Sequence, residues 1–263
     1  MASEDNVNYI EKPSLRKPYV ICGLTGSFNS GNVSIGGVNY FINQFHAVKF
    51  AEMPASRYRI YQIPGVDSLR PAFRMEDGLI TDSRFPANEF FYAKTGSDHD
   101  LILFRGDEPN LNWEEYAGTI ADVALQFGAA RLYSMGAILD MTPYTREPLL
   151  SCTCSSPEVK VEMEGYSVTF SNREGMGSYG QMLVYTCREK GLEAVNFTAR
   201  VPCYPDFNVF LGESPKSVKA ILVRLRDLMH CDIDFSKLDK DISDMEGKLD
   251  FVRQQNPNFN TLI

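Results

Sequence analysis

The chain has 263 residues, of which 44% are hydrophobic, and it carries a formal net charge of -8. This length suits one large domain, or one domain with an appendage, and the composition is that of a globular protein with a buried core. The excess of acidic residues argues against nucleic-acid binding and against attachment to anionic membranes. The sequence has no apolar run long enough to span a bilayer and no signal-peptide core, which predicts a cytoplasmic protein.

The first half of the chain alternates between strand and helix patterns. Residues 1–16 are expected to form a flexible arm ahead of an α/β domain at 17–232. An apolar run predicts a strand at 18–24, which leads through a glycine-rich turn into a helix at 33–45. The elements expected next are strands at 47–53 and 58–63, loops over 65–85 with a hairpin turn at Asp77-Gly78, a buried strand at 100–105, a helix at 113–127 that ends at Gly128, and a strand at 131–137.

The second half repeats this alternation. Residues 149–170 are expected to be exposed, extended structure with turns. The elements expected next are a helix at 181–190 after a second glycine-rich turn, a strand at 194–201, a helix from Pro215 to about residue 229, and a helix at 236–255 with Ser236 as its N-cap. The order of these elements indicates an α/β fold with parallel strands at the centre of its sheet.

The last helix carries an apolar seam. Its apolar residues fall at spacings of four, three, four and three, which is typical of a helix that packs on another helix. These residues are Leu238, Ile242, Met245, Leu249 and Val252. We expect residues 233–263 to form a C-terminal extension that packs on its own domain or on a neighbouring subunit, and both alternatives remain open.

The glycine-rich turn at 23–37 has two interpretations. It fits neither the dinucleotide-binding nor the P-loop pattern, because its glycines have other spacings and no lysine follows them. The free amides of a helix N-terminus, with Ser27, Asn29 and Asn32 beside them, could still bind an anion. Alternatively, the glycines serve only to bring helix and strand close together, which is the interpretation that we favour.

Polar residues also follow two of the predicted strands. Asp107 and Glu108 could bind magnesium or act as acid and base, but carboxylates before a helix also complement its dipole. Thr145 and Arg146 follow the strand at 131–137. A ligand site at the carboxyl ends of the strands would therefore gather seven residues: Ser27, Asn29, Asn32, Asp107, Glu108, Thr145 and Arg146.

The sequence contains no catalytic motif and predicts no metal site or cofactor. Its six cysteines are scattered, and the pair Cys152 and Cys154 would make half a zinc site at best. Buried, reduced thiols are the expected state of these side chains.

Six segments, taken in order and spacing, resemble one family. They are LTGSFNSGNVSIGGVNYFI near the start, SLRPAF at 68–73, DGLI at 77–80, FRGDEPNLNWEEYAGTIADVALQFGAARLYSMGAI, TPYTREP at 142–148 and GMGSYGQMLVYTCREKGLEAVNFTARVPCY at 175–204. Over residues 17–255 the chain resembles the proteasome assembly chaperone two family of archaeal and bacterial proteins.

The resemblance implies a phosphorylase/hydrolase-like three-layer sandwich with a central mixed, mostly parallel sheet. It also implies a homo-oligomer whose relatives help proteasome α subunits to assemble. Archaeal relatives often end in a hydrophobic–tyrosine–any-residue tail that docks between α subunits, whereas Leu262 stands at the tyrosine position here. Docking of that kind is therefore not expected.

Two functions remain open from the sequence. The first is a non-enzymatic protein-interaction protein that resembles proteasome assembly chaperones. The alternative is a nucleotide- or small-anion-binding enzyme, ligase-like or phosphorylase-like, with its site at the carboxyl ends of the strands.

Overall fold

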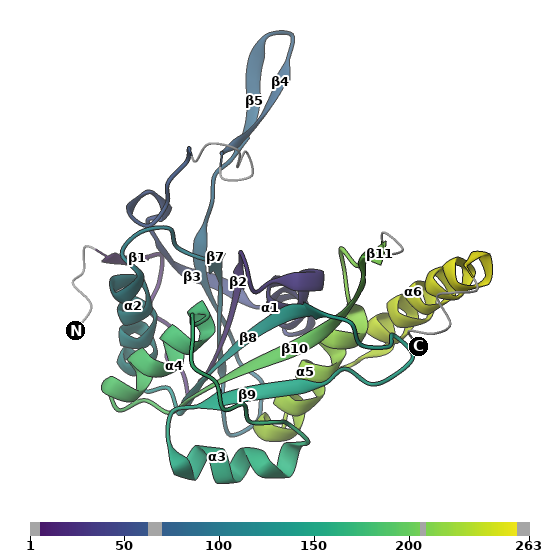
Figure 1. Cartoon of the computed structure of the whole chain (residues 1–263). Helices are drawn as coiled ribbons and strands as arrows, with labels where there is room; N and C mark the ends of the chain where they lie inside the picture. The colour runs from purple at the N-terminus through teal and green to yellow at the C-terminus, as the bar shows by residue number, and fades with distance from the viewer. Residues whose placement is uncertain (1–5, 63–69, 206–208, 257–263) are drawn as a thin grey trace.

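A computed structural model describes residues 6–62, 70–205 and 209–256 (Figure 1). Residues 1–5 of the expected arm, Ser68 of the SLRPAF segment and the tail around Leu262 lie outside these ranges. The main sheet has nine strands in the order β1-β3-β6-β7-β2-β8-β10-β11, with β9 also paired to β10, and a separate two-stranded sheet contains β4 and β5.

The elements have the following bounds. The strands are β1 (Asn8–Tyr9), β2 (Tyr19–Thr25), β3 (Val48–Met53), β4 (Ala72–Glu76), β5 (Leu79–Arg84), β6 (Asn88–Ala93), β7 (Leu101–Asp107), β8 (Arg131–Asp140), β9 (Leu150–Cys154), β10 (Ala194–Tyr204) and β11 (Val209–Phe210). The α-helices are α1 (Val33–Gln44), α2 (Trp113–Gln126), α3 (Pro157–Met163), α4 (Tyr179–Glu189), α5 (Pro215–Met229) and α6 (Ser236–Gln255).

The centre of the sheet is parallel and its flanks are antiparallel. Strands β7, β2, β8 and β10 run parallel to one another. Strand β6 pairs antiparallel with β7, and β9 and β11 pair antiparallel with β10. The predicted α/β class and mixed sheet with a parallel centre are therefore confirmed.

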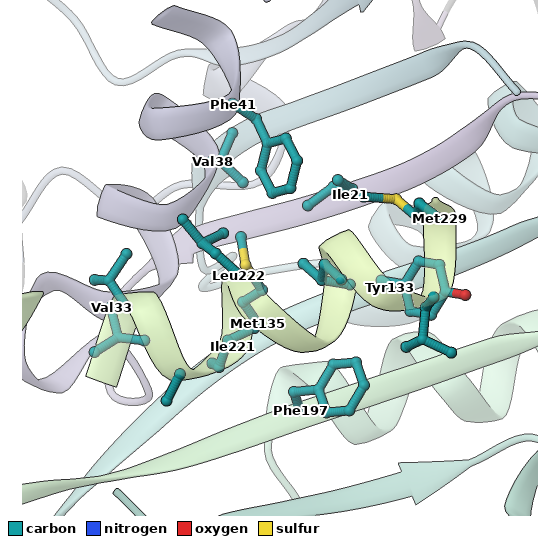
Figure 2. Close-up of a cluster of buried hydrophobic side chains, with 14 of the residues drawn as sticks. Ile21, Val33, Val38, Phe41, Tyr133, Met135, Phe197, Ile221, Leu222 and Met229 are labelled. Carbon is teal, nitrogen blue, oxygen red and sulfur yellow. The ribbon is translucent and has the colours of Figure 1, made fainter. Parts of the chain in front are cut away.

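Helices cover both faces of the sheet, so its central strands are apolar on both sides. Ile21 of β2 packs into a cluster with residues of α1 and α5, which Figure 2 shows in close-up. Its neighbours Val20 and Cys22 point the other way, into a second cluster with residues of α2 and α4. This alternation explains why the sequence of β2 is a continuous apolar run.

Residues 149–170 include extended structure, as predicted, but the expectation that the segment is exposed and without a helix was wrong. The whole of strand β9 pairs with residues Val195 to Ala199 of β10, and α3 follows it. The start of α3 has a recognisable signal, because the Ser156 side chain accepts a hydrogen bond from Val159 N at 3.3 Å and Pro157 stands in the first turn.

The strand expected at 58–63 is also absent from its described part, residues 58–62. Tyr58 is buried against Tyr116, with the two rings edge to face at 4.9 Å, and its carbonyl accepts hydrogen bonds from Asn110 N and Leu111 N. Its apolar ring is thus buried by packing in a loop instead of by pairing in a sheet.

The segment 65–85, expected as loops, contains the β4–β5 hairpin in its described part. Its turn lies at Asp77-Gly78, as predicted, and both residues have positive φ angles, 49° and 78°. Asp-Gly is a favoured pair for such a turn. Strand β6, which follows and lies between β3 and β7 in the sheet, was not predicted at all, although Asn88 and Phe90 are buried.

No helix among the described residues is both long and apolar enough to cross a membrane.

Strand β2 lies so close to α1 at Gly23 that a side chain does not fit between them. A Cβ on Gly23 would overlap the backbone carbonyl oxygen of Ser34 and lie 2.6 Å from a methyl group of Val38. Close packing was predicted for the glycines inside the helix itself, and Gly37 does lie against Met135 of β8.

We expect Gly23→Ala to lower the free energy of unfolding by about 1–3 kcal/mol, because α1 must move away from the sheet. Gly247→Ala is the matched control, since Gly247 is in α6 and no atom lies within 4 Å of its added Cβ. There the change should raise the free energy of unfolding by about 0.5–1 kcal/mol. Urea unfolding monitored by circular dichroism measures both, and equal midpoints for Gly23→Ala and the unmodified chain would contradict the packing argument.

Candidate functional site

The carboxyl ends of β2, β7 and β8 meet the first turns of α1 and α4. This edge is where open α/β sheets place their ligands. The structure brings three of the seven expected site residues together here, namely Ser27, Asp107 and Glu108, but it assigns them to contacts within the chain.

The acidic pair ties the end of β7 to the loop after β2. Asp107 accepts a short hydrogen bond from the Thr25 hydroxyl, and the Arg59 guanidinium lies 3.0 Å from its other carboxylate oxygen. Glu108 accepts a hydrogen bond from Ser27 N at 2.8 Å. Both carboxylates thus have partners from neighbouring loops, and their role in this structure is to hold those loops.

Two buried tyrosines support this edge from the α2 and α4 side. Tyr116 donates to Asn88 Oδ1 at 2.8 Å, and Tyr179 donates to the Trp113 carbonyl at 3.0 Å. Burial raises the pKa of both Tyr116 and Tyr179 well above the ordinary value, so both phenols stay protonated and act as donors.

Asn29 occupies the N-terminus of α1. Its side-chain oxygen accepts hydrogen bonds from Ser34 N at 2.9 Å and Ile35 N at 3.1 Å. These are amides of the kind that an anion would bind at a helix N-terminus. The structure therefore favours the structural interpretation of the glycine-rich turn, with Asn29 in place of an anion. Asn32 lies beside it in the left-handed conformation, with a φ angle of 54°.

The crevice between the strand ends is nearly filled. Its volume is about 20 Å³, which suits roughly one water molecule. The polar groups in it bond to one another: Ser134 donates to Asn196 at 2.8 Å, and Asn196 donates to Thr198 at 3.1 Å. Gly180 of α4 packs directly on the Asn196 amide.

Ser134 and Asn196 were not among the predicted site residues. A signal was present, because Ser134 interrupts the apolar run between Arg131 and Asp140, and Asn196 stands directly between Val195 and Phe197. Buried polar groups need hydrogen-bond partners, so two such residues in neighbouring strands indicate a bonded pair.

Thr145 and Arg146 do not belong to this edge. Both are exposed in the loop after β8, and within the described residues no hydrogen bond or ion pair joins either side chain to Asp107 or Glu108. The seven expected residues thus fall into three separate groups. Ser27, Asp107 and Glu108 connect the loops at the strand ends, Asn29 and Asn32 lie at the start of α1, and Thr145 and Arg146 lie in this exposed loop.

The loop that carries Thr145 and Arg146 packs against α6. Tyr144 N donates to the Tyr204 hydroxyl at 2.7 Å, and the Tyr144 hydroxyl donates to Asp250 of α6. Lys216 bridges the same elements, with the Tyr144 carbonyl at 3.1 Å and Glu246 at 2.8 Å. Burial, followed by the bond to Asp250, raises the pKa of Tyr144, which keeps its phenol protonated as a donor.

The seam of α6 faces its own chain. Leu238 and Leu249 are buried, and Ile242, Met245 and Val252 are half-buried. Leu249 and Met245 pack with Tyr144 and Tyr204. These contacts lie within the single chain, and packing on its own domain instead of on a neighbouring subunit stays a prediction.

A second cavity of about 210 Å³ lies between α1 and the starts of α5 and α6. Its lining is mainly polar and includes Asn32, Asn39, Asn43, Glu213, Lys237 and Asp241. Its charged lining residues are one cation, Lys237, and two carboxylates, Glu213 and Asp241.

The two cysteines of β9 lie side by side, with 3.7 Å between their sulfur atoms. The hydrogen bond that they share raises the pKa of Cys152 and lowers that of Cys154. In the part of the chain that the structure describes, no third cysteine, histidine or carboxylate joins them in a group that could hold a metal ion.

Comparison with known proteins gives one family and a consistent fold. The model of the PAC2 family matches residues 23–252. No protein with a curated description matches the sequence.

Several solved structures are similar to this one. A proteasome-assembly chaperone homologue from Mycobacterium tuberculosis is 24% identical with a TM-score of 0.78, over 88% of this chain and 93% of that chain. A Mycobacterium tuberculosis protein of unknown function is 18% identical with a TM-score of 0.84, over 99% of this chain and 86% of that chain. An archaeal proteasome activator from Pyrococcus furiosus is 22% identical with a TM-score of 0.71, over 94% of this chain and 98% of that chain. At these identities the likeness shows the fold.

Replacement of Asn29 tests whether this side chain caps α1. We expect Asn29→Ala to lower the free energy of unfolding by about 1 kcal/mol, because two amides lose their acceptor. Asn29→Asp keeps an acceptor oxygen and should retain most of that stability. Chemical unfolding measures the free energy of unfolding of the unmodified chain and of both variants. If Asn29→Ala is as stable as the unmodified chain, the hydrogen bonds from Asn29 to these amides do not stabilise α1.

The packing of α6 on its own domain can be tested on neighbouring positions of the same helix. Leu249 is 4% exposed, whereas Phe251 is 63% exposed. Leu249→Ala should lower the free energy of unfolding by about 2 kcal/mol or more, and Phe251→Ala should change it by no more than about 0.5 kcal/mol. A helix that packs only on a neighbouring subunit would instead make the effect of Leu249→Ala depend on protein concentration.

Proposed function

Because the chain belongs to the PAC2 family, we propose that it is a non-enzymatic protein-interaction protein with a proteasome-assembly-chaperone-like role. The observation that carries the proposal is the match of the family model to residues 23–252, which is most of the chain. The fold agrees, because solved structures described as a proteasome-assembly chaperone homologue and a proteasome activator share it.

The partner in this proposal is the α subunit of the proteasome, and the chain also associates with copies of itself. The proposal includes a cytoplasmic location. The described residues support an interaction role through exposed apolar side chains, most of all Phe73, Met75, Leu79 and Ile80 of the β4–β5 hairpin. Exposed apolar groups that gather in this way mark sites of protein interaction.

The groups at the strand ends support the same reading. Asp107, Glu108 and Asn29 already bond to other groups of the chain, and the crevice at the strand ends has a volume of about 20 Å³. Sites for small molecules are typically several hundred Å³ in volume. Among residues 6–62, 70–205 and 209–256, no contact favours the nucleotide- or anion-binding enzyme as a second candidate.

The proposal is tested with proteasome subunits from the same organism. The purified chain is mixed with α subunits, and separately with β subunits as the control, and complexes are detected by size-exclusion chromatography with light scattering. We expect a complex with α subunits alone, because the proposed role precedes the joining of the two subunit types. We also expect the chain to change the rate at which α subunits form rings, measured by native mass spectrometry.

The opposite result is equally clear. If no complex with α subunits forms over a range of salt and protein concentrations, and the rate of ring formation stays the same, the proteasome part of the proposal is wrong. Binding to α and β subunits alike would indicate nonspecific adhesion and would also count against it.

A further inference from the structure

The two cysteines of β9 form a pair of thiols in direct contact. Side chains two residues apart on a strand point to the same face, and the sulfur atoms of Cys152 and Cys154 lie 3.7 Å apart. Cys152 is 6% exposed and packs in the cluster that includes Val159 and Met163 of α3, whereas Cys154 is half-buried at the margin of that cluster. The pair therefore has one sulfur inside the protein and one within reach of solvent.

The contact makes the two thiols chemically unequal. The hydrogen bond from the Cys152 thiol stabilises the thiolate of Cys154, so it lowers the pKa of Cys154 and raises that of Cys152. Arg131 and Lys160 lower the pKa of Cys154 further, and burial and the Glu162 carboxylate oppose them. Both cations are themselves ion-paired, so the neighbouring thiol has the largest effect. Cys154 is thus the nucleophile of the pair.

The other four cysteines differ from Cys154 in both respects. Cys22, Cys187, Cys203 and Cys231 are 7% exposed or less, and burial raises the pKa of each. All six cysteines lie in the described ranges, so Cys154 is the one thiol of the chain that combines exposure with a lowered pKa. Thiols with these two properties and with a second cysteine beside them are the ones that react with oxidants.

The backbone of β9 limits how the two thiols can be joined. Two residues of a strand span about 6.4–6.8 Å between Cα atoms, whereas disulfides usually join Cα atoms about 4.4–6.8 Å apart. A disulfide within β9 therefore lies near the upper limit and is strained. Cys154 is the last residue of β9, where it pairs with Val195 of β10, so the end of the strand can adjust. Strained disulfides are easily reduced, which favours a reversible link over a permanent one.

We propose that β9 carries a redox-modification site, in which Cys152 and Cys154 form a reversible disulfide on reaction with hydrogen peroxide. The Cys154 thiolate attacks one oxygen of the peroxide. The O–O bond breaks, Cys154 becomes a sulfenic acid, and hydroxide leaves and takes up the proton that the Cys154 thiol gave to solvent. The Cys152 sulfur then attacks the Cys154 sulfur, and the sulfenic oxygen leaves as water with the Cys152 proton. Two thiols are oxidised to one disulfide, and one peroxide is reduced to two water molecules.

The resting state of the pair depends on the compartment. In a reducing compartment such as the cytoplasm, disulfides are transient, and a cellular thiol such as glutathione returns the pair to the two thiols seen in the structure. The inference goes beyond the proposed function, because the chemistry of the pair requires no proteasome subunit.

The first experiment uses the unmodified full chain. The reduced protein is treated with hydrogen peroxide, its remaining thiols are alkylated in denaturant, and it is digested with trypsin. Both cysteines fall in the peptide 147–160, which contains no other cysteine. We expect mass spectrometry to show that this peptide loses two hydrogen atoms and both alkylation sites. The loss should be at least about tenfold faster than the loss of the site at Cys187, and glutathione should restore both sites.

Serine variants distinguish the roles of the two thiols. In Cys152→Ser the thiolate of Cys154 still reacts, but no second thiol displaces the oxygen, so a sulfenic acid accumulates and is trapped by dimedone. In Cys154→Ser the remaining thiol is buried, and dimedone labelling should be at least about tenfold lower. Cys203→Ser is the matched control, because Cys203 is 5% exposed in β10 and its loss should leave disulfide formation unchanged. Far-ultraviolet circular dichroism confirms that the variants are folded.

Three results would overturn the inference. The first is a peptide 147–160 that keeps both alkylation sites under conditions in which Cys187 is already oxidised. The second is oxidation of Cys154 in the unmodified chain to a sulfinic acid without a disulfide. The third is equal dimedone labelling of Cys152→Ser and Cys154→Ser, which would mean that Cys154 is not the reacting thiol. The first two results come from the unmodified chain, so they do not depend on the folding of any variant.

Discussion

The hydroxyl of Ser34 joins α1 to two neighbouring strands. It accepts a hydrogen bond from Leu24 N of β2 at 2.9 Å and donates one to the Met135 carbonyl of β8 at 2.5 Å. The pairing of β2 with β8 ends at this level, with Gly23 opposite Met135. The bare backbone at Gly23 lets the helix come close enough for these bonds. The small crevice, the Asn29 cap and the position of the loop after β2 all depend on this close contact between helix and strands.

Much of the fold could be predicted from the sequence, because its central elements are long and strongly patterned. The limits of α5 were predicted correctly, since Pro215 marks its start and a regular apolar stripe follows. Segments at the periphery were harder. Strand β9 and helix α3 are short, and β9 is defined by its long-range pairing with β10, which no local pattern reveals.

The candidate site was less predictable for a physical reason. A polar residue ahead of a helix can hold an anion or can itself occupy the helix amides, and the two cases look alike in sequence. Asn29 does the second, at 2.9 Å and 3.1 Å from its donors. Arg146 shows the other difficulty: it follows a central strand, yet β8 extends to Asp140 and the chain then turns toward α6, away from the crevice. Residues that follow parallel strands share an edge only when the strands end at the same level.

The separation of the hairpin from the body has a consequence for how the molecule opens. Backbone hydrogen bonds that no tertiary layer protects can break without unfolding the rest of the chain, so the peptide hydrogens of β4 and β5 should exchange with solvent far faster than those of β2 or β8. For the same reason substitutions there leave the two hydrophobic clusters of the body intact. The segment can therefore change its sequence, and with it the choice of a binding partner, while the folded framework remains the same.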